Sequence, residues 1–474
     1  MIDLSTLTIQ KAHDALTQGE FTARDLAEAY LAEIKKRDGD IHAYLEVYED
    51  VLKQADAADL RIKAGKAVAL TGIPLAIKDN ILIEGRRAQS ASKILDGYVA
   101  PYDATAIKKL KEAGAVFIGR ANMDEFAMGG STENSAFGVT KNPHDLARVA
   151  GGSSGGSAAA VGGGLALAAL GSDTGGSVRQ PASYCGVVGL KPTYGSISRH
   201  GLMAMGSSLD IIGPLTKTVA DAEILFDAMK GKDRYDSTSI DPIPETATPK
   251  KPVIGVPRHF LTGDGIDPEV MRAFEASVEK FRGMGYEIRD IELPNIEYSL
   301  AVYYVLMPAE VSTNLSRFDG VKYGYHKDGA TLLDDYLLSR GEGFGREARR
   351  RIMLGAYVLS SGYYDAYYNK ASAVRELLKK DFVKAFESVD AIIMPTAPAP
   401  AFKIGDKISD PVAMYLEDIF TVTANLVGVP AMSIPAGSKQ EGGKDLPIGL
   451  QIIADMRRED VLFALGKKFL GEVE

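Results

Sequence analysis

Apolar residues recur along the chain at two alternating spacings, one typical of helices and one typical of buried strands. Through the first 65 residues the spacing is helical, with Thr22 as a candidate N-cap and a second helical run over 49–63. Short apolar runs then follow at 67–70, 75–77 and 115–118, in the stretch that ends at Gly171, and at 253–256, 286–291, 391–394 and 449–454. Helical patterns lie at 104–113, after Ser157, at 268–284 and at 459–469. This alternation predicts an α/β fold with a largely parallel or mixed sheet that helices cover on both faces.

The same pattern indicates how the chain is organised. No clean boundary interrupts it, so we expect 1–474 to form a single domain, with N-terminal helices in 1–65 and a core in 66–232. Residues 233–251 are polar and contain prolines, which predicts a surface excursion. Residues 295–385 have helical character and many tyrosines, which predicts a helical insertion. These tyrosines could form an exposed interface, but we expect them to be buried.

Composition and charge narrow the class of protein. The chain has 474 residues, 46% hydrophobic and 25% charged, which is ordinary for a globular protein. With 54 basic and 63 acidic residues, its formal net charge of −9 argues against a broad nucleic-acid-binding surface. The single cysteine, Cys185, excludes a disulfide framework and a zinc site of several cysteines. No apolar run reaches the roughly 18 residues of a membrane span and no signal peptide opens the chain, so we expect a cytoplasmic protein without membrane contact.

Glycine is concentrated in one part of the chain. Of 49 glycines, 13 lie between residues 129 and 177, together with 7 serines. A flexible linker has a similar composition, but the apolar runs at 158–161 and 165–170 require burial. We therefore interpret this stretch as closely packed backbone in which some residues need a positive φ.

Several familiar catalytic motifs are missing from the sequence. It contains no Walker A loop, no His-Glu-x-x-His and no Cys-x-x-Cys. The string Gly-x-Ser-x-Gly occurs at 151–155 and 152–156, but such matches arise by chance in a stretch this rich in glycine and serine. A turn rather than a strand precedes it, which argues against an α/β-hydrolase. None of the six histidines lies in a strongly marked motif, so a histidine-based triad is disfavoured.

A different set of residues suits nucleophilic catalysis. Lys78 ends an expected buried strand, where α/β active sites collect, and residues 151–157 open an Ala-rich helix. The glycines before Ser177 allow main-chain N–H groups to converge, as an oxyanion hole requires. Without a histidine, the base for this serine would be a lysine whose pKa is lowered by burial. Each feature alone has a simpler explanation, since a strand-end lysine is usually solvated and a serine after two glycines usually belongs to a turn.

Taken together, these segments resemble the amidase signature family. The resemblance covers 151–160, 171–181 (GSDTGGSVRQP), 182–192 and 72–80 (GIPLAIKDN). It implies the fold of that family, a mixed, twisted central β-sheet covered by helices on both faces. It also implies a Ser–cis-Ser–Lys triad, with Ser177 as the nucleophile, Ser153 as the bridging serine and Lys78 as the base. The oxyanion hole would be made by backbone N–H groups around Thr174, Gly175 and Gly176.

Outer segments resemble one branch of this family, the glutamine-hydrolysing subunits of tRNA-dependent amidotransferases. They are 121–138 (ANMDEFAMGGSTENSAFG), 314–324 (NLSRFDGVKYG), 350–364 (RRIMLGAYVLSSGYY) and 394–400 (MPTAPAP). The resemblance implies that glutamine is bound by Tyr303, with Tyr304 as the alternative in register, and by Arg351 and Asp418. An arginine suits the carboxylate of glutamine and an aspartate suits its ammonium group. By spacing alone, however, Arg351 would be interpreted as part of a solvated basic patch at 349–351.

The resemblance also implies partners. Ammonia from glutamine would pass to a partner subunit that converts Glu-tRNA(Gln) to Gln-tRNA(Gln), or Asp-tRNA(Asn) to Asn-tRNA(Asn), in a heterotrimer with B-type and C-type subunits. ATP and Mg²⁺ would bind at the partner, which fits the absence of a phosphate-binding loop here, and this chain would need no metal or cofactor. The tRNA would be contacted mainly through the partner. Two alternatives are a standalone amidase for a small or aromatic amide, which would not need Arg351 and Asp418, and an inactive scaffold subunit.

Overall fold

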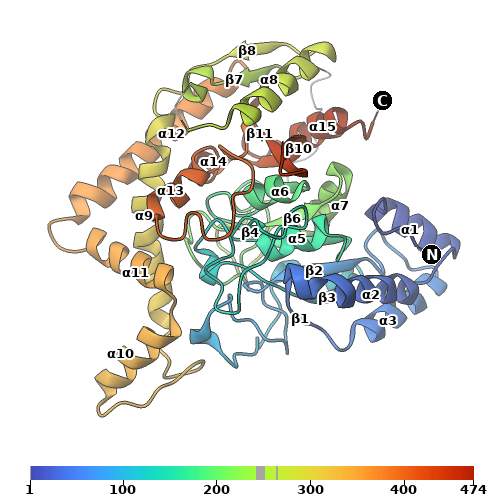
Figure 1. The fold of residues 1–474 in the computed structure, drawn as a ribbon, viewed down its shortest axis with the longest axis horizontal. Helices are drawn as coiled ribbons and strands as arrows, with labels where there is room; N and C mark the ends of the chain where they lie inside the picture. The colour runs from blue at the N-terminus through green and yellow to red at the C-terminus, as the bar shows by residue number, and fades with distance from the viewer. Residues whose placement is uncertain (1, 242–250, 263–264, 474) are drawn as a thin grey trace.

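A single mixed sheet of eleven strands organises the described part of the chain (Figure 1). The computed structural model describes residues 2–241, 251–262 and 265–473. The strands, in their order across the sheet, are β1 (Tyr44–Val47), β3 (Val116–Ala121), β2 (Pro74–Lys78), β4 (Ala168–Asp173), β6 (Ile211–Thr216), β5 (Val188–Lys191), β10 (Ala431–Glu441), β11 (Lys444–Ala454), β9 (Ala391–Pro395), β7 (Ile254–Val256) and β8 (Ile288–Asp290). Strands β3–β2–β4 and β9–β7–β8 pair in parallel, and the other neighbours are antiparallel. The predicted mixed sheet is therefore confirmed.

Helices cover both faces of this sheet. They are α1 (Ile9–Gln18), α2 (Ala23–Ile41), α3 (Val51–Lys63), α4 (Thr105–Glu112), α5 (Gly155–Gly162), α6 (Arg179–Cys185), α7 (Val219–Met229), α8 (Pro268–Gly283), α9 (Ser299–Asn314), α10 (Leu332–Gly343), α11 (Arg346–Val358), α12 (Lys370–Phe386), α13 (Pro411–Tyr415), α14 (Val422–Val427) and α15 (Glu459–Leu470). Successive residues of β10 show the two layers, since Met432 packs against Gly466 of α15 while Ser433 lies beside Ser183 of α6. Neighbouring strand residues point to opposite faces, so α6 and α15 lie on opposite sides. The predicted coverage of both faces is confirmed.

Two local predictions differ from the structure near the N-terminus. Residues 67–70 do not form the predicted strand, since 67–68 are irregular and 69–70 begin a turn, and Gly72 follows with a φ of +81°. The segment expected to be helical throughout contains a strand, β1, which pairs antiparallel with the edge of the sheet at β3. That pairing provides main-chain partners for a four-residue segment too short for a clear hydrophobic pattern.

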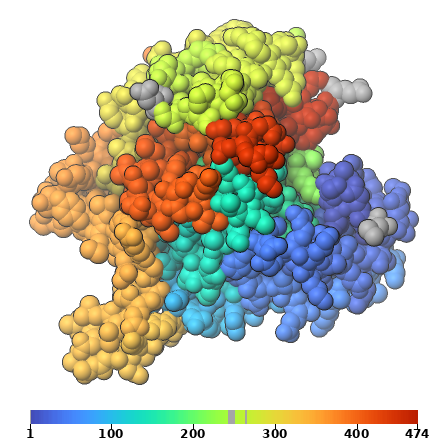
Figure 2. Space-filling view, viewed as in Figure 1, coloured from blue at the N-terminus to red at the C-terminus, as the bar shows by residue number. Residues whose placement is uncertain are grey.

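Residues 295–385 contain α9, α10, α11 and α12. These helices enclose a second apolar core around Leu306, Met307 and Leu378, separate from the core that lines the sheet. Figure 2 shows the segment around α10 projecting from the rest of the molecule. The expectation of buried tyrosines is wrong for most of this segment, because its exposed side chains include Tyr298, Tyr323, Tyr357, Tyr363, Tyr364 and Tyr367.

The predicted surface excursion at 233–251 is only partly described. Residues 242–250 lie outside the described part, and Asp236 in the preceding turn is buried against Arg199. None of the helices in the described ranges is long and apolar enough to cross a membrane. The boundaries drawn from the sequence between the segments of this domain remain predictions.

Candidate active site

Lys78 lies at the carboxyl end of β2, a strand buried along its whole length between β3 and β4. Its side chain is fully buried. The Nζ atom lies 2.8 Å from both Ser153 Oγ and Ser154 Oγ, and 2.9 Å from Ser172 Oγ. It also lies 3.2 Å from the Ser172 carbonyl oxygen. Three hydroxyls around one amine provide partners for its neutral form, since a hydroxyl can donate to the free electron pair of the nitrogen.

Burial lowers the pKa of Lys78 from its ordinary value of 10.5 to about 7. Three buried carboxylates, Asp124, Asp173 and Asp210, act in the opposite direction by stabilising the ammonium form. The desolvation of the amine outweighs them, so at neutral pH a large share of Lys78 is uncharged. A buried lysine in this state can act as a general base.

Ser153 follows a cis peptide bond between Gly152 and Ser153 and stands just before α5. The backbone here is closely packed, because a Cβ at Gly152 would lie 2.1 Å from Asp124 Oδ2. The Gly152 N–H donates to Gln180 Oε1 at 2.9 Å, and the Asp124 N–H donates to the Ser153 carbonyl at 3.2 Å. These contacts fix the main chain that carries the Ser153 hydroxyl next to Lys78.

Ser177 lies between β4 and α6 and is 8% exposed. Its carbonyl accepts a hydrogen bond of 3.1 Å from the Ser154 N–H, so the two serine-bearing loops are adjacent. Within the described ranges, the Ser177 hydroxyl itself makes no hydrogen bond. The structure thus places Lys78 and Ser153 in direct contact, with Ser177 on the neighbouring loop and its hydroxyl free.

The three residues predicted for the oxyanion hole precede Ser177 directly, but their N–H groups are not equivalent. The Gly176 N–H donates to Asp173 Oδ1 at 2.8 Å and is therefore already occupied. In the part of the chain that the structure describes, the N–H groups of Thr174 and Gly175 have no hydrogen-bond partner. These two amides, rather than that of Gly176, are free to receive an oxyanion.

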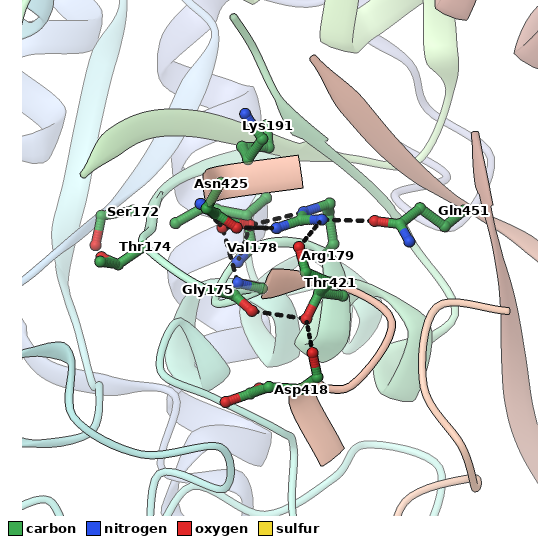
Figure 3. A network of polar contacts seen from close by, with 12 residues as sticks. Ser172, Thr174, Gly175, Val178, Arg179, Lys191, Asp418, Thr421, Asn425 and Gln451 are labelled. Carbon is green, nitrogen blue, oxygen red and sulfur yellow. Dashed lines mark hydrogen bonds and ion pairs between the residues drawn. The ribbon is translucent and has the colours of Figure 1, made fainter. Parts of the chain in front are cut away.

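A buried ion pair supports this loop, and Figure 3 shows its arginine, Arg179, together with Thr421, Asn425 and Gln451. Arg179 contacts both carboxylate oxygens of Asp173 at 3.0 Å, and both side chains are fully buried. The pair holds the pKa of Asp173 well below its usual range although burial opposes this. Arg179 also donates to the Thr421 carbonyl at 2.9 Å, to Asn425 Oδ1 at 2.6 Å and to Gln451 Oε1 at 2.5 Å. The sequence pattern did not indicate this network, although Asp173 and Arg179 stand inside the segment GSDTGGSVRQP.

The two tyrosines considered for glutamine binding face different parts of the site. Tyr303 is buried against the loop before Ser177, since a Cβ at Gly175 would lie 2.6 Å from its ring. The Tyr304 hydroxyl donates to Asp418 Oδ2 at 2.8 Å, and its ring centre lies 5.4 Å from the Arg351 guanidinium. Tyr304 therefore contacts the other two predicted binding residues, whereas Tyr303 contacts the catalytic loop.

Arg351 is not part of a solvated patch, because it is only 3% exposed. Its Nε donates to Glu347 Oε1 at 2.7 Å, and the Tyr415 hydroxyl donates to the same oxygen at 2.8 Å. Burial of the Asp418 carboxyl raises its pKa to about 7, and the residue as a whole is half-buried. Tyr304 thus joins a fixed cation, Arg351, which Glu347 already contacts on one side, to Asp418, a carboxyl that can become an anion.

A cavity of about 380 Å³ opens beside this cluster. Arg351, Glu347 and Tyr415 line it together with Glu125 and Ser131. This volume lies within the range of small-molecule sites. Among the described residues there is no group of three or more histidine, cysteine, aspartate or glutamate side chains that could hold a metal ion.

Comparison with known proteins agrees with this geometry. A family model described as Amidase matches residues 25–463. The A-type subunit of glutamyl-tRNA(Gln) amidotransferase from Geobacter metallireducens is 50% identical over 99% of this chain and 97% of that protein, and the protein of the same name from Alkalilimnicola ehrlichii is 52% identical over 98% and 96%. The crystal structure of the A-type glutamyl-tRNA(Gln) amidotransferase subunit from Thermotoga maritima superposes with a TM-score of 0.80 at 43% identity, covering 99% of this chain and 94% of that one.

Proposed function

The chain belongs to the amidase family, and from this premise we propose that it is the glutamine-hydrolysing subunit of a tRNA-dependent amidotransferase. The observation that carries the chemistry is the buried Lys78, whose Nζ lies 2.8 Å from Ser153 Oγ, with Ser177 on the adjacent loop. The near-full-length similarity to subunits named for glutamyl-tRNA(Gln) supports the choice of glutamine as the amide.

The reaction begins with proton transfer along the three catalytic residues. Neutral Lys78 accepts a proton from Ser153 while Ser153 accepts one from Ser177. Ser177 Oγ forms a bond to the side-chain amide carbon of glutamine, and the carbonyl electrons move to its oxygen. The N–H groups of Thr174 and Gly175 stabilise that oxyanion. This relay requires the Ser177 hydroxyl to turn toward Ser153, and no hydrogen bond in the described part of the chain holds it elsewhere.

The second half of the reaction releases both products. The C–N bond breaks as the proton returns through Ser153, so the nitrogen leaves as ammonia and a glutamyl ester remains on Ser177. Water, deprotonated by the same lysine and serine, then cleaves this ester. The products are glutamate and the free Ser177 hydroxyl, so no cofactor is consumed.

Glutamine binds through its two charged groups. The guanidinium of Arg351 has nitrogens that do not contact Glu347, and these receive the α-carboxylate of glutamine. Asp418 ionises and pairs with the α-ammonium group. Tyr304 holds Asp418 through its hydroxyl, and the Tyr303 ring packs against Gly175 of the loop before Ser177. A neutral amide would gain nothing from this pair of charges.

The remaining components lie outside this chain. In our proposal it acts in the cytoplasm within a heterotrimer, beside B-type and C-type subunits. The partner holds ATP, Mg²⁺ and most of the tRNA, and uses the ammonia to amidate Glu-tRNA(Gln), with Asp-tRNA(Asn) as a possible second acceptor.

The test is ammonia release from glutamine, first by the chain alone and then with co-expressed partner subunits, ATP and Glu-tRNA(Gln). We expect weak activity alone and a strong rise with the complete assembly, and none with Ser177→Ala. Vigorous hydrolysis of simple amides without partners, with glutamine ignored, would instead identify a standalone amidase and remove the roles given to Arg351 and Asp418.

A further inference from the structure

The peptide unit between Gly175 and Gly176 is held at both ends. Its carbonyl oxygen, on Gly175, accepts a hydrogen bond of 2.6 Å from Thr421 Oγ1, 246 residues further along the chain. Its N–H, on Gly176, donates to Asp173 Oδ1 at 2.8 Å. Figure 3 shows Thr421 below Arg179, between Gly175 and Asp418. Because a glycine has no side chain to restrict its own backbone, these two contacts decide how this peptide is oriented.

Thr421 also packs tightly against the loop. A Cβ at Gly176 would lie 2.3 Å from Thr421 Oγ1 and 2.8 Å from Thr421 Cβ. Gly176 has a φ of +134°, which side chains rarely tolerate. The loop therefore approaches Thr421 as closely as its backbone allows, and the Thr421 side chain is fully buried at this contact.

The same residue is tied to the proposed ammonium-binding group. The Thr421 N–H donates to the Asp418 carbonyl at 3.0 Å, and Thr421 Oγ1 lies 3.1 Å from the same oxygen. Arg179 holds Thr421 from the other side through the Thr421 carbonyl at 2.9 Å. One residue thus bonds to the loop before the nucleophile, to the main chain of a substrate-binding residue and to the buried ion pair.

We propose that Thr421 is a positioning residue whose hydroxyl holds the Gly175–Gly176 peptide so that Ser177 and the free amides before it face the substrate. This inference rests on the proposed function, because the substrate that it concerns is glutamine. Thr421 itself touches neither the substrate nor the triad. Its effect reaches the reaction only through the orientation of the loop.

One pair of variants and a control position isolate the effect of the Thr421 hydroxyl. Thr421→Ala and Thr421→Ser differ by one oxygen atom, so a difference between them reports the hydroxyl, whose short contact is the 2.6 Å bond to the Gly175 carbonyl and whose longer one is the 3.1 Å approach to the Asp418 carbonyl. Thr423 provides a matched control in α14, since it is buried but its hydroxyl has no hydrogen-bond partner among the described residues. Thr421→Val is a second variant without the hydroxyl, for use if the alanine variant does not assemble.

We expect Thr421→Ala to lower kcat for glutamine by roughly 10- to 100-fold, because misplacing reacting groups by about 1 Å costs up to about 100-fold. KM should stay within about twofold, since the backbone N–H of residue 421 still holds the Asp418 carbonyl. Thr421→Ser should restore most of kcat, and Thr423→Ala should leave both constants unchanged. A merely structural role would not separate kcat from KM in this way.

The assay uses the complete assembly with its partner subunits and has two readouts. One is ammonia release from glutamine, and the other is the rate at which a sulfonyl fluoride modifies Ser177, followed by intact mass. Labelling that slows in Thr421→Ala and recovers in Thr421→Ser supports the proposal even if the wild type ignores glutamine, in which case only the proposed function fails. If folded Thr421→Ala or Thr421→Val has the same kcat and the same labelling rate as the wild type, the inference is overturned.

Discussion

The protonation of Lys78 should control how glutamine hydrolysis depends on pH. The general base must be neutral, and burial lowers its pKa from 10.5 to about 7. This change corresponds to about 5 kcal/mol against the ammonium form, at about 1.4 kcal/mol for each factor of ten. Without it, only about three lysines in ten thousand would be neutral at pH 7, whereas with it about half are.

The expected profile of kcat follows from the same value. The neutral share of Lys78 is about one half at pH 7, about one tenth at pH 6 and about one hundredth at pH 5. We therefore expect log kcat to rise with a slope of one up to about pH 7 and then to level off. Burial raises the pKa values of Asp124 and Asp210 to about 6, so both are ionised at pH 7. In that form they stabilise the ammonium form of Lys78, which keeps the pH at which kcat levels off from falling below about 7.

Asp418 titrates near the same pH as Lys78, but its ionisation affects kcat/KM rather than kcat. Burial raises the pKa of Asp418 to about 7, and the free site needs this carboxyl ionised to receive the ammonium group of glutamine. Bound ammonium lowers the pKa of Asp418, so its ionisation affects kcat/KM and not kcat. Below pH 7 the slope of log kcat/KM should therefore approach two, while that of log kcat remains one.

The measurement is steady-state ammonia release between pH 5 and 9 at constant ionic strength, with the intact assembly. Asp418→Asn is the control, since it should raise KM, reduce the slope of log kcat/KM to one and leave the kcat profile in place. A kcat that continues to rise tenfold per pH unit beyond pH 8 would mean that the pKa of Lys78 is not lowered to about 7. A kcat independent of pH between 5 and 7 would refute the assignment of Lys78 as the base.

Three substitutions test the remaining roles, and a fourth, Tyr303→Phe, is the control for Tyr304→Phe. Lys78→Met keeps the length of the side chain but removes the amine, so ammonia release should fall by at least about 100-fold with an unchanged circular dichroism spectrum. Arg351→Lys keeps the charge but loses the planar fork, so KM for glutamine should rise about tenfold in steady-state assays while kcat changes little. Tyr304→Phe removes the donor to Asp418, which raises the pKa of that carboxyl and should move the acid limb of kcat/KM to higher pH. Tyr303→Phe should leave that limb in place, and equal profiles for the two variants would contradict the distinction between them.

The fold was predictable from the sequence where the hydrophobic pattern is continuous. Helices α4, α8 and α15 and the strands β2, β3 and β9 coincide with uninterrupted runs. The central strands β6 and β10 escaped prediction because Pro214 interrupts the first, and Pro435 and Gly437 the second. Both strands form antiparallel pairs all the same, with a register shift between Pro435 and Gly437. Tertiary pairing outweighs local preference there.

Some residues of the candidate site could likewise be predicted from the sequence, and others could not. Lys78, Ser153 and Ser177 stand in contiguous segments whose residue types carry the chemistry, so the sequence could indicate them. Burial distinguishes Arg351 from its solvated neighbours, and burial depends on how α11 packs against α9, which no local pattern contains. The hydrogen bond from Thr421 to Gly175 joins two segments 246 residues apart, and neither local sequence indicates that they are in contact.

The glycines of the catalytic loop explain why a buried ion pair lies next to it. Gly175 and Gly176 permit close approach of Tyr303 and Thr421, but they contribute no side chain that could fix the backbone. The buried pair of Asp173 and Arg179 is a costly way to add stability, because two charges leave water. Its value lies elsewhere: Asp173 binds the Gly176 N–H while Arg179 binds the Thr421 carbonyl, so the pair connects both supports of the loop. A flexible backbone that must hold an oxyanion to within a fraction of an ångström needs rigid partners, and here they come from the neighbouring strand and helices.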